Sequence, residues 1–331
     1  MRIFNFEARE YSADFMRDGY VHIPGGVSPD FLTYALAFSD SKVAEEKGGE
    51  IEEKRIRGKK RQYLMEFPET SDFPGELYRS VAEVAQLNVD RMMISERHIK
   101  IYEDVAPADP PAHKDRLASE VTVGLGLRIP PESWLKLYPD TELTINPFQS
   151  TREWRDSLDE PDLPENRLAD VEPVRIDMRA GDVVMFAGSS VYHERVNPAN
   201  TWVLYLKLNA MRLDPLSEDP STAPQRAASL EILATAGDEA LLDRRVEVSP
   251  RLDHVSRHYT RNHFAEVLLA YITNEKKFTL SEEELRALLV IGDGTPTIRD
   301  VIHRMGHPFQ TALEHMPMFR RLGQRGAIDF L

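Results

Sequence analysis

The sequence predicts a mainly β protein with helices: an antiparallel barrel or sandwich behind N-terminal helices, followed by a separate helical domain. From residue 94 onward apolar residues recur with period two, which is the pattern of strands that bury one face. Several such segments follow one another without helices between them, which favours antiparallel pairing. After the Pro-rich and acidic stretch 214–224, the apolar spacing changes to that of helices.

Elements before residue 94 show the signals of helices and one short strand. Gly19 is expected to end the first helix, and Ser28 provides a capping hydroxyl ahead of Pro29 for the second. The predicted elements are a helix over 11–18, a strand over 20–24, and helices over 29–44 and 75–87. The charged stretch 45–62 is interpreted as a solvated loop, with a mobile lid that meets an anionic substrate as the alternative.

The predicted strands carry polar or small residues on one face. In the strand 97–102 this face holds His98, Lys100 and Tyr102. The strand 121–129 has an apolar face and a second face composed of Thr122, Gly124, Gly126 and Arg128. Because glycines leave space beside them, this second face is expected to line a cavity. Further strands are predicted over 174–178, 183–186 and 201–209, with an insertion over 150–173.

Residues 214–225 are predicted to be a linker between two domains, 1–213 and 226–331. The second domain is expected to be helical almost to its end. Its elements include a helix after the capping-box pair Ser281 and Glu284, helices over 297–305 and 308–322, and a strand over 327–331. Three helices followed by a strand resemble a winged-helix unit.

Composition excludes several classes of protein. The 331 residues include no cysteine, which rules out disulfide scaffolds, thiolate metal sites and cysteine nucleophiles. No apolar run approaches the roughly 18 residues of a membrane-spanning helix, and the N-terminus lacks the pattern of a signal peptide. We therefore expect a cytoplasmic protein that does not associate with a membrane.

The net charge of −14 is unevenly distributed. Residues 226–331 contain 14 basic and 15 acidic residues, which leaves 27 basic and 40 acidic residues in 1–225. Neither part has the basic surplus that binding to a phosphate backbone requires. The charges argue against nucleic acid as a partner, so dimerisation or packing is the favoured role of the C-terminal region.

One group of residues has the pattern of a metal site. His113 and Asp115 stand two residues apart before the strand 121–129, so both side chains point the same way in an extended chain. His193 follows an apolar strand that begins after a Gly-Asp turn. Two histidines and one carboxylate on one face of an octahedral metal ion leave three positions open, which is the ligand set of non-haem Fe(II) oxygenases.

With these residues the sequence resembles the Fe(II)/2-oxoglutarate-dependent dioxygenases. The resemblance covers roughly residues 10–213 and implies a double-stranded β-helix, the jelly-roll or cupin fold. The segment 15–21, FMRDGYV, is similar to the phytanoyl-CoA hydroxylase-like branch. Membership implies Fe(II), 2-oxoglutarate and O₂, with His113, Asp115 and His193 as the metal ligands.

The resemblance also implies a base that pairs with the distal carboxylate of 2-oxoglutarate. We favour Arg128, the position that JmjC-like oxygenases use, because a guanidinium can bind a carboxylate bidentately. Lys207, on a polar strand face, is a close alternative, and Arg195 is a weaker candidate. Thr122 is assigned to the same cosubstrate site.

The resemblance implies oxidative decarboxylation of 2-oxoglutarate to succinate and CO₂, coupled to attack on a C–H bond. The carboxylate of Asp115 favours hydroxylation, desaturation or cyclisation, since halogenating relatives replace this carboxylate by a small residue. We expect a small polar metabolite, such as an amino-acid-like biosynthetic intermediate, and assign its binding to His98, Lys100 and Tyr102.

Two alternatives are consistent with the same pattern. The spacing to Arg128 and the winged-helix-like C-terminus favour a JmjC-like hydroxylase of ribosomal proteins or peptides. A cupin sensor fused to a DNA-binding winged helix is the second alternative, which the near-neutral C-terminal region disfavours. A second copy of the chain, bound through the C-terminal region, is a candidate partner in either case.

Overall fold

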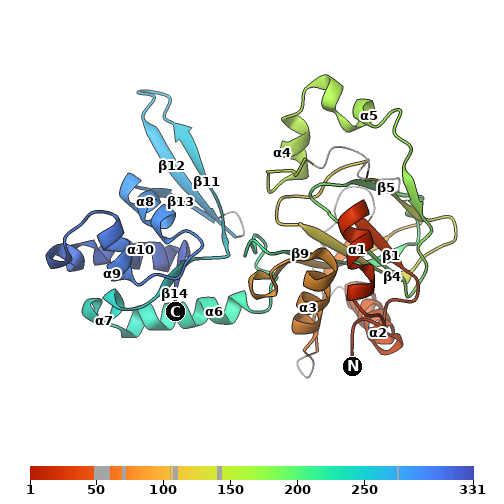
Figure 1. The fold of residues 1–331 in the computed structure, drawn as a ribbon, viewed down its shortest axis with the longest axis horizontal. Helices are drawn as coiled ribbons and strands as arrows, with labels where there is room; N and C mark the ends of the chain where they lie inside the picture. Colours follow the sequence, from red (N-terminus) through yellow and green to blue (C-terminus); the bar gives the residue numbers. More distant parts are fainter. Residues whose placement is uncertain (48–59, 69–71, 105, 107–110, 140–143, 274–275) are drawn as a thin grey trace. The chain divides into compact units, whose positions relative to one another are not determined.

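The computed structural model describes residues 1–47, 60–68, 72–104, 106, 111–139, 144–273 and 276–331. The chain divides into two compact units, Met1–Arg212 and Leu213–Leu331 (Figure 1). Of the charged stretch 45–62, interpreted as a solvated loop with a lid as the alternative, residues 48–59 lie outside the described residues, while its two ends belong to a helix and a strand rather than to a loop. No helix in the described ranges is long and apolar enough to cross a membrane.

The first unit begins with the predicted helices and strand. They are α1 (Arg9–Asp18), β1 (Tyr20–Ile23), α2 (Pro29–Lys47) and α3 (Phe73–Ala85), with a short 3₁₀ turn η1 (Val89–Arg91). Gly19 ends α1 in a left-handed conformation, with φ of 74°, which glycine adopts without steric cost. The Ser28 hydroxyl accepts a hydrogen bond from the Phe31 N–H at 3.2 Å and so caps α2.

Two antiparallel sheets form the centre of this unit. The larger sheet has the strand order β1-β7-β4-β9-β3-β2 and the smaller one β6-β5-β8. Their strands are β2 (Lys60–Leu64), β3 (Met93–Tyr102), β4 (Val121–Arg128), β5 (Trp134–Tyr138), β6 (Val174–Ile176), β7 (Val183–Phe186), β8 (Tyr192–Val196) and β9 (Trp202–Asn209). This arrangement confirms the predicted antiparallel strands and is consistent with a double-stranded β-helix core.

The two faces of the larger sheet have different roles. Apolar side chains of β4 and β9, such as Val123 and Leu206, join one core cluster with Phe31 of α2 and Leu77 of α3. The alternate residues of the same strands point to the other face, as the two-residue period of a strand requires. Thr122 lies on that face and lines a cavity.

Two parts of the first unit differ from the prediction. The insertion 150–173 holds helices, namely α4 (Thr151–Asp156), the 3₁₀ turn η2 (Glu160–Asp162) and α5 (Pro164–Arg167). The strands β2, β5 and β8 were not predicted. The sequences of β2 and β8 are rich in charged and polar residues, which hide the apolar alternation of a strand.

The second unit contains more strand than predicted. Its elements are α6 (Thr222–Thr235), α7 (Asp238–Leu242), β10 (Val246–Val248), β11 (Leu252–Tyr259), β12 (Glu266–Ile272), β13 (Lys276–Leu280), α8 (Glu282–Ile291), α9 (Ile298–Arg304), the 3₁₀ helix η3 (Phe309–His315), α10 (Met316–Arg325) and β14 (Ile328–Phe330). The expectation of a helical region was therefore wrong for 246–280, where β11, β12 and β13 form a sheet. Beyond Ser281 the predicted helix over 297–305 and the terminal strand are present, and β14 pairs with β10. The helix predicted over 308–322 is instead divided into the 3₁₀ helix η3 and the α-helix α10.

The predicted linker 214–225 belongs to the packed second unit. Asp214 is fully buried, and its carboxylate accepts hydrogen bonds from the Glu218 N–H at 2.8 Å and the Thr222 hydroxyl at 2.6 Å. Helix α6 begins at Thr222, within the same stretch. Pro and acidic residues here form a hydrogen-bonded turn at the start of a helix instead of an exposed connection.

Candidate metal centre

A backbone bridge places the two histidines of the predicted triad side by side. The His113 N–H donates to the His193 carbonyl at 3.0 Å, and the His193 N–H donates to the His113 carbonyl at 2.9 Å. This reciprocal pair is an antiparallel bridge, so both rings leave the backbone on the same side, with centroids 4.4 Å apart. Residues far apart in the sequence thereby become neighbours.

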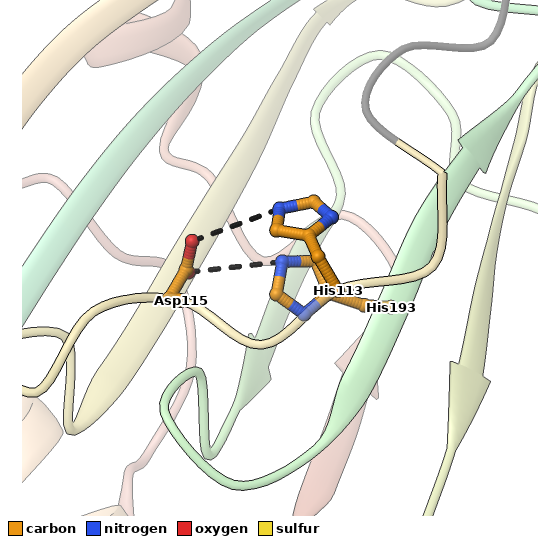
Figure 2. Close-up of side chains that lie close together, drawn as sticks. All are labelled: His113, Asp115 and His193. Atoms are coloured by element: carbon orange, nitrogen blue, oxygen red, sulfur yellow. Dashed lines mark ion pairs between the residues drawn. The ribbon is translucent and has the colours of Figure 1, made fainter. Parts of the chain in front are cut away.

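Asp115 faces the two rings from the start of the loop that leads to β4. Its carboxylate oxygens lie 3.9 Å from His113 Nε2 and 3.7 Å from His193 Nε2 (Figure 2). The potential ligand atoms of all three residues lie within 4.8 Å of one another. The structure therefore brings together the three side chains that the sequence pattern selected.

The histidine tautomers suit metal binding. His113 Nδ1 lies 2.9 Å from the Pro111 carbonyl, and His193 Nδ1 lies 3.0 Å from the Val191 carbonyl. Because a carbonyl only accepts, each Nδ1 carries the proton and each Nε2 presents a free lone pair towards Asp115. Backbone carbonyls commonly orient metal-binding histidines in this way.

The carboxylate of Asp115 is held by two other side chains. The Thr122 hydroxyl donates to Oδ2 at 2.7 Å, and the Lys207 ammonium donates to Oδ1 at 2.7 Å. A Cβ placed on Gly188 would lie 2.3 Å from Thr122 Oγ1 and 3.0 Å from Asp115 Oδ2. Gly188 is thus required for this close approach, and each carboxylate oxygen keeps a further lone pair for a metal ion.

Burial and neighbouring charges keep the triad in its metal-binding protonation state. Burial lowers the pKa of His113 to about 3, and the adjacent His193 acts in the same direction. Burial likewise lowers the pKa of His193. Burial opposes ionisation of Asp115, but Lys207 and the two imidazoles outweigh it and lower the pKa of this carboxyl. At neutral pH the triad is two neutral imidazoles and one carboxylate.

The donor set fits a ferrous ion. Two imidazole nitrogens and a carboxylate oxygen on one side of a point are the ligands of mononuclear non-haem iron centres, and they leave positions open for other ligands. A cavity of about 420 Å³ lies against the triad, with walls from β3, β4, β5, β8 and β9 and from α4. Ligands of an ion held here would therefore have room beside it.

A buried group of charges extends from the triad along β3. Lys207 lies 3.3 Å from Glu96, which also pairs with Lys100 at 3.1 Å and Arg116 at 3.2 Å. Burial opposes ionisation of Glu96, but these cations lower the pKa of its carboxyl well below the usual range. Glu96 was not predicted, although it lies on the face that contains His98, Lys100 and Tyr102 and follows their two-residue period.

The predicted substrate residues have different positions. Lys100 and Tyr102 line the cavity, and Lys100 Nζ lies 5.1 Å from the ring centroid of Tyr205. His98 is not among the lining residues, since its Nδ1 lies 3.4 Å from Glu96 and also contacts Gln62 on β2. Of the three polar residues on this face of β3, Lys100 and Tyr102 therefore line the cavity, whereas His98 contacts Gln62 on β2.

The predicted base Arg128 lies away from the triad. Its guanidinium pairs with Asp40 at 2.8 Å, stacks over Trp202, and is about half exposed. The pairing of β4 with β9 shifts register between Gly126 and Arg128, so Arg128 no longer continues the cavity face that starts at Thr122. This position does not support Arg128 as the base that binds the cosubstrate.

Arg195 lies inside the cavity and has neutral partners. It is 7% exposed, and its guanidinium contacts the Tyr205 hydroxyl at 3.3 Å, Ser133 Oγ at 3.5 Å and Met178 Sδ at 3.6 Å. No carboxylate of the described residues forms an ion pair with it. A buried charge without a counter-ion is costly, so this position suits an anionic ligand. Arg195 was a weaker candidate in the sequence, and the strand β8 that carries it was not predicted.

Among the comparisons with known proteins, solved structures are the ones that match this chain. No family model matches the sequence, and no curated protein matches it. The chain is similar to the non-haem α-ketoglutarate-dependent epimerase SnoN from nogalamycin biosynthesis, at 17% identity over 63% of this chain and 84% of that chain, with a TM-score of 0.45.

Two further solved structures show a similar degree of likeness. The α-ketoglutarate-dependent carbocyclase SnoK from nogalamycin biosynthesis is 19% identical over 61% of this chain and 85% of that chain, with a TM-score of 0.44. A Pseudomonas putida prolyl-4-hydroxylase is 17% identical over 61% of this chain and 97% of that chain, with a TM-score of 0.38.

Proposed function

We propose that the chain is a non-haem Fe(II)/2-oxoglutarate-dependent oxygenase that oxidises a C–H bond of a small polar metabolite. The observation that carries the proposal is the His113–Asp115–His193 triad, in which both free imidazole lone pairs point towards one carboxylate beside a cavity. When bound, the ion would supply the oxidising chemistry together with 2-oxoglutarate and O₂, where O₂ is the oxidant and succinate and CO₂ are released.

The chain's own residues divide the remaining tasks. Asp115 and the two histidines hold the ion, while Thr122 and Lys207 fix the carboxylate. Arg195 is the favoured partner for the distal carboxylate of 2-oxoglutarate, because its contacts with neutral groups leave its positive charge uncompensated. Lys207 is less suited to this task, since it already contacts two carboxylates.

The lining of the cavity supports a polar or anionic substrate. Its basic residues are Lys100, Lys114, Arg152, Arg155, Arg195 and Lys207. Asp115 is the single acidic residue among the described lining residues, although the chain as a whole carries a net charge of −14. Carboxylates pair with four of these cations, namely Lys100, Arg152, Arg155 and Lys207. A substrate carboxylate or phosphate would therefore be complemented mainly by Arg195 and Lys114, whose printed contacts are with neutral groups.

Anaerobic spectroscopy tests the proposal directly. Adding Fe(II) and 2-oxoglutarate to metal-free protein should produce a weak visible charge-transfer band that requires both additions. The band should be absent in His113→Ala and retained in His263→Ala, which removes an exposed histidine of the second unit. A band of equal strength in His113→Ala, or no band in the wild-type protein, would contradict the proposal.

The substrate can be found through the cosubstrate product. Succinate release in the presence of O₂ should increase with the correct substrate, so a screen of small carboxylates, amino acids and phosphorylated metabolites identifies its class. The identity of the product then separates hydroxylation, desaturation and cyclisation. The carboxylate at position 115 supports these outcomes over halogenation, because it occupies the ligand position that a halide would need.

Two alternatives predict other partners. A JmjC-like peptide hydroxylase with a C-terminal winged helix would release succinate with basic or ribosomal peptides in the same screen. A cupin sensor with a DNA-binding winged helix would bind duplex DNA specifically at physiological salt, which a polarisation titration measures. Sedimentation of the full chain tests whether the second unit serves in forming a homodimer.

A further inference from the structure

A second group of two histidines and one carboxylate lies in the second unit. His315 Nδ1 is 2.9 Å from Glu283 Oε1, and His307 Nε2 is 3.5 Å from the same oxygen. The two imidazole centroids are 4.0 Å apart, and the three potential ligand atoms lie within 4.8 Å of one another. The cluster belongs to a different unit from the proposed iron site.

Each member of the cluster is fixed by the end of a helix. Glu283 lies in the first turn of α8, where Ser281 and Glu284 form a reciprocal capping box. His307 directly follows Gly306, whose φ is 88°; the Gly306 N–H donates to His303 and the His307 N–H to Ile302. These two bonds form a Schellman motif, which ends α9 and fixes the backbone of His307.

The third member, His315, ends η3 and precedes the buried Met316 at the start of α10. The positions of the three side chains thus do not depend on a long loop. In the first turn of α8, Glu284 is engaged by the capping box and by Arg321, whereas Glu283 forms ion pairs with His307 and His315. The cluster therefore has a preformed backbone and a carboxylate directed at two imidazoles.

Two of the three separations between potential ligand atoms are compatible with a tetrahedral cation. Zinc binds imidazole nitrogen and carboxylate oxygen at about 2.0–2.1 Å, so tetrahedral ligand atoms are separated by about 3.3 Å. The two nitrogen–oxygen distances of 2.9 and 3.5 Å lie on either side of this value.

We propose that Glu283, His307 and His315 form a second metal site, which binds a borderline divalent cation of the zinc class. Imidazole and carboxylate ligands suit Zn²⁺ and Co²⁺. The side chains of Glu283 and His307 are 47% and 32% exposed, so water can complete the coordination. By joining α8 to the ends of α9 and η3, the ion stabilises the fold of the second unit.

The test uses the full-length, metal-free chain with His113→Ala, which removes binding at the proposed iron site. Titration with Zn²⁺ should show one equivalent by calorimetry, and Co²⁺ should give the strong visible bands of tetrahedral coordination. Zn²⁺ should also raise the melting temperature of this variant, since an ion that binds the folded state stabilises it.

Further variants in the same background assign the binding to the cluster. His307→Ala and His315→Gln should each weaken Zn²⁺ binding by more than about 100-fold, exceeding the loss typical of residues that only support a ligand. The control is His303→Ala, one helical turn earlier on α9. Far-ultraviolet circular dichroism verifies that each variant is folded. Glu283→Gln replaces the carboxylate ligand by an amide of nearly equal size and should also weaken Zn²⁺ binding.

Two results would overturn this proposal. One is the absence of both a Zn²⁺ equivalent and tetrahedral Co²⁺ bands in His113→Ala. The other is unchanged binding in folded His307→Ala and His315→Gln. Neither result bears on the proposed oxygenase activity, which has its own spectroscopic test with Fe(II) and 2-oxoglutarate.

Discussion

The two units each bring two histidines and one carboxylate together, but the surroundings of these groups differ. In the first unit Asp115 and His193 are buried, and both His113 and His193 donate from Nδ1 to backbone carbonyls. In the second unit Glu283 and His307 are substantially exposed, and the two imidazoles point at one carboxylate oxygen.

This difference shows that the ligand types alone do not define the chemistry of such a site. The first group adjoins a cavity lined by Arg195 and Lys100, which we propose holds an anionic cosubstrate and a substrate. The second group connects the ends of helices, where a bound ion has a structural effect. The two proposed roles, a reactive metal centre and a structural metal site, thus differ in the contacts that hold the ligands and in the cavity beside them.

The largest expected effect tests the reactive centre. Asp115→Ala should reduce succinate release to background, because the carboxylate ligand is lost and the Lys207 ammonium loses its closest counter-ion. Asp40→Ala, which removes an exposed partner of Arg128, should retain succinate release. Substantial turnover by Asp115→Ala in a coupled succinate assay would remove the triad from the mechanism.

The next effect concerns the binding of 2-oxoglutarate. Arg195→Leu should weaken it by about 30-fold or more, since removing one partner of a buried, hydrogen-bonded charge pair costs about 2–5 kcal/mol. Arg128→Leu is the matched control, because Arg128 is paired with Asp40 outside the cavity. Titration followed by the charge-transfer band measures both variants. An effect of Arg128→Leu alone would restore the interpretation drawn from the sequence.

A smaller effect is expected for residues that support the metal ligand. Thr122→Val removes the hydrogen bond to Asp115 Oδ2, and Gly188→Ala places a methyl group against that contact. Each should weaken Fe(II) binding by about 10–100-fold, the range typical of such supporting groups. Gly237→Ala introduces a methyl group into open space and should leave the Fe(II) affinity unchanged. Equal affinities in all three variants would show that the support is dispensable.

The smallest effect concerns the helix that carries Glu283. Ser281→Ala removes the cap of α8 and should lower the free energy of unfolding by about 1 kcal/mol, as loss of an N-cap generally does. The control is Thr235→Ala, whose hydroxyl bonds to a carbonyl within its own helix. Urea unfolding of the full chain compares the two variants. A larger loss in Thr235→Ala would contradict the assigned role of the cap.

The triad could be predicted because its determinants are local. His113 and Asp115 are two residues apart, and His193 follows a recognisable apolar strand, so the pattern needed no knowledge of the whole fold. The position of Thr122 on the side of β4 that faces the cavity could also be predicted, because successive residues of a strand alternate between its two faces. The pairing of His113 with His193 could not be derived, because it depends on a backbone bridge between distant segments.

The errors arise where local pattern and tertiary context disagree. Arg128 follows the alternation of β4, but a shift of register turns it towards Asp40. The buried position of Arg195 in the cavity wall was not predicted, because β8 was not recognised as a strand. The strand β11 was missed because it is largely exposed, so its polar residues hide the alternation that a half-buried strand shows.

The backbone bridge between His113 and His193 also determines which parts of the chain can diverge independently. It fixes the two ligands to each other whatever path the intervening segment takes, while α4 and α5 of that segment contribute Trp154 and Pro164 to the cavity wall. Insertions, deletions and substitutions there would reshape the wall without moving the ligands. Related chains could therefore acquire new substrates through changes in α4 and α5 while they retain the same metal geometry.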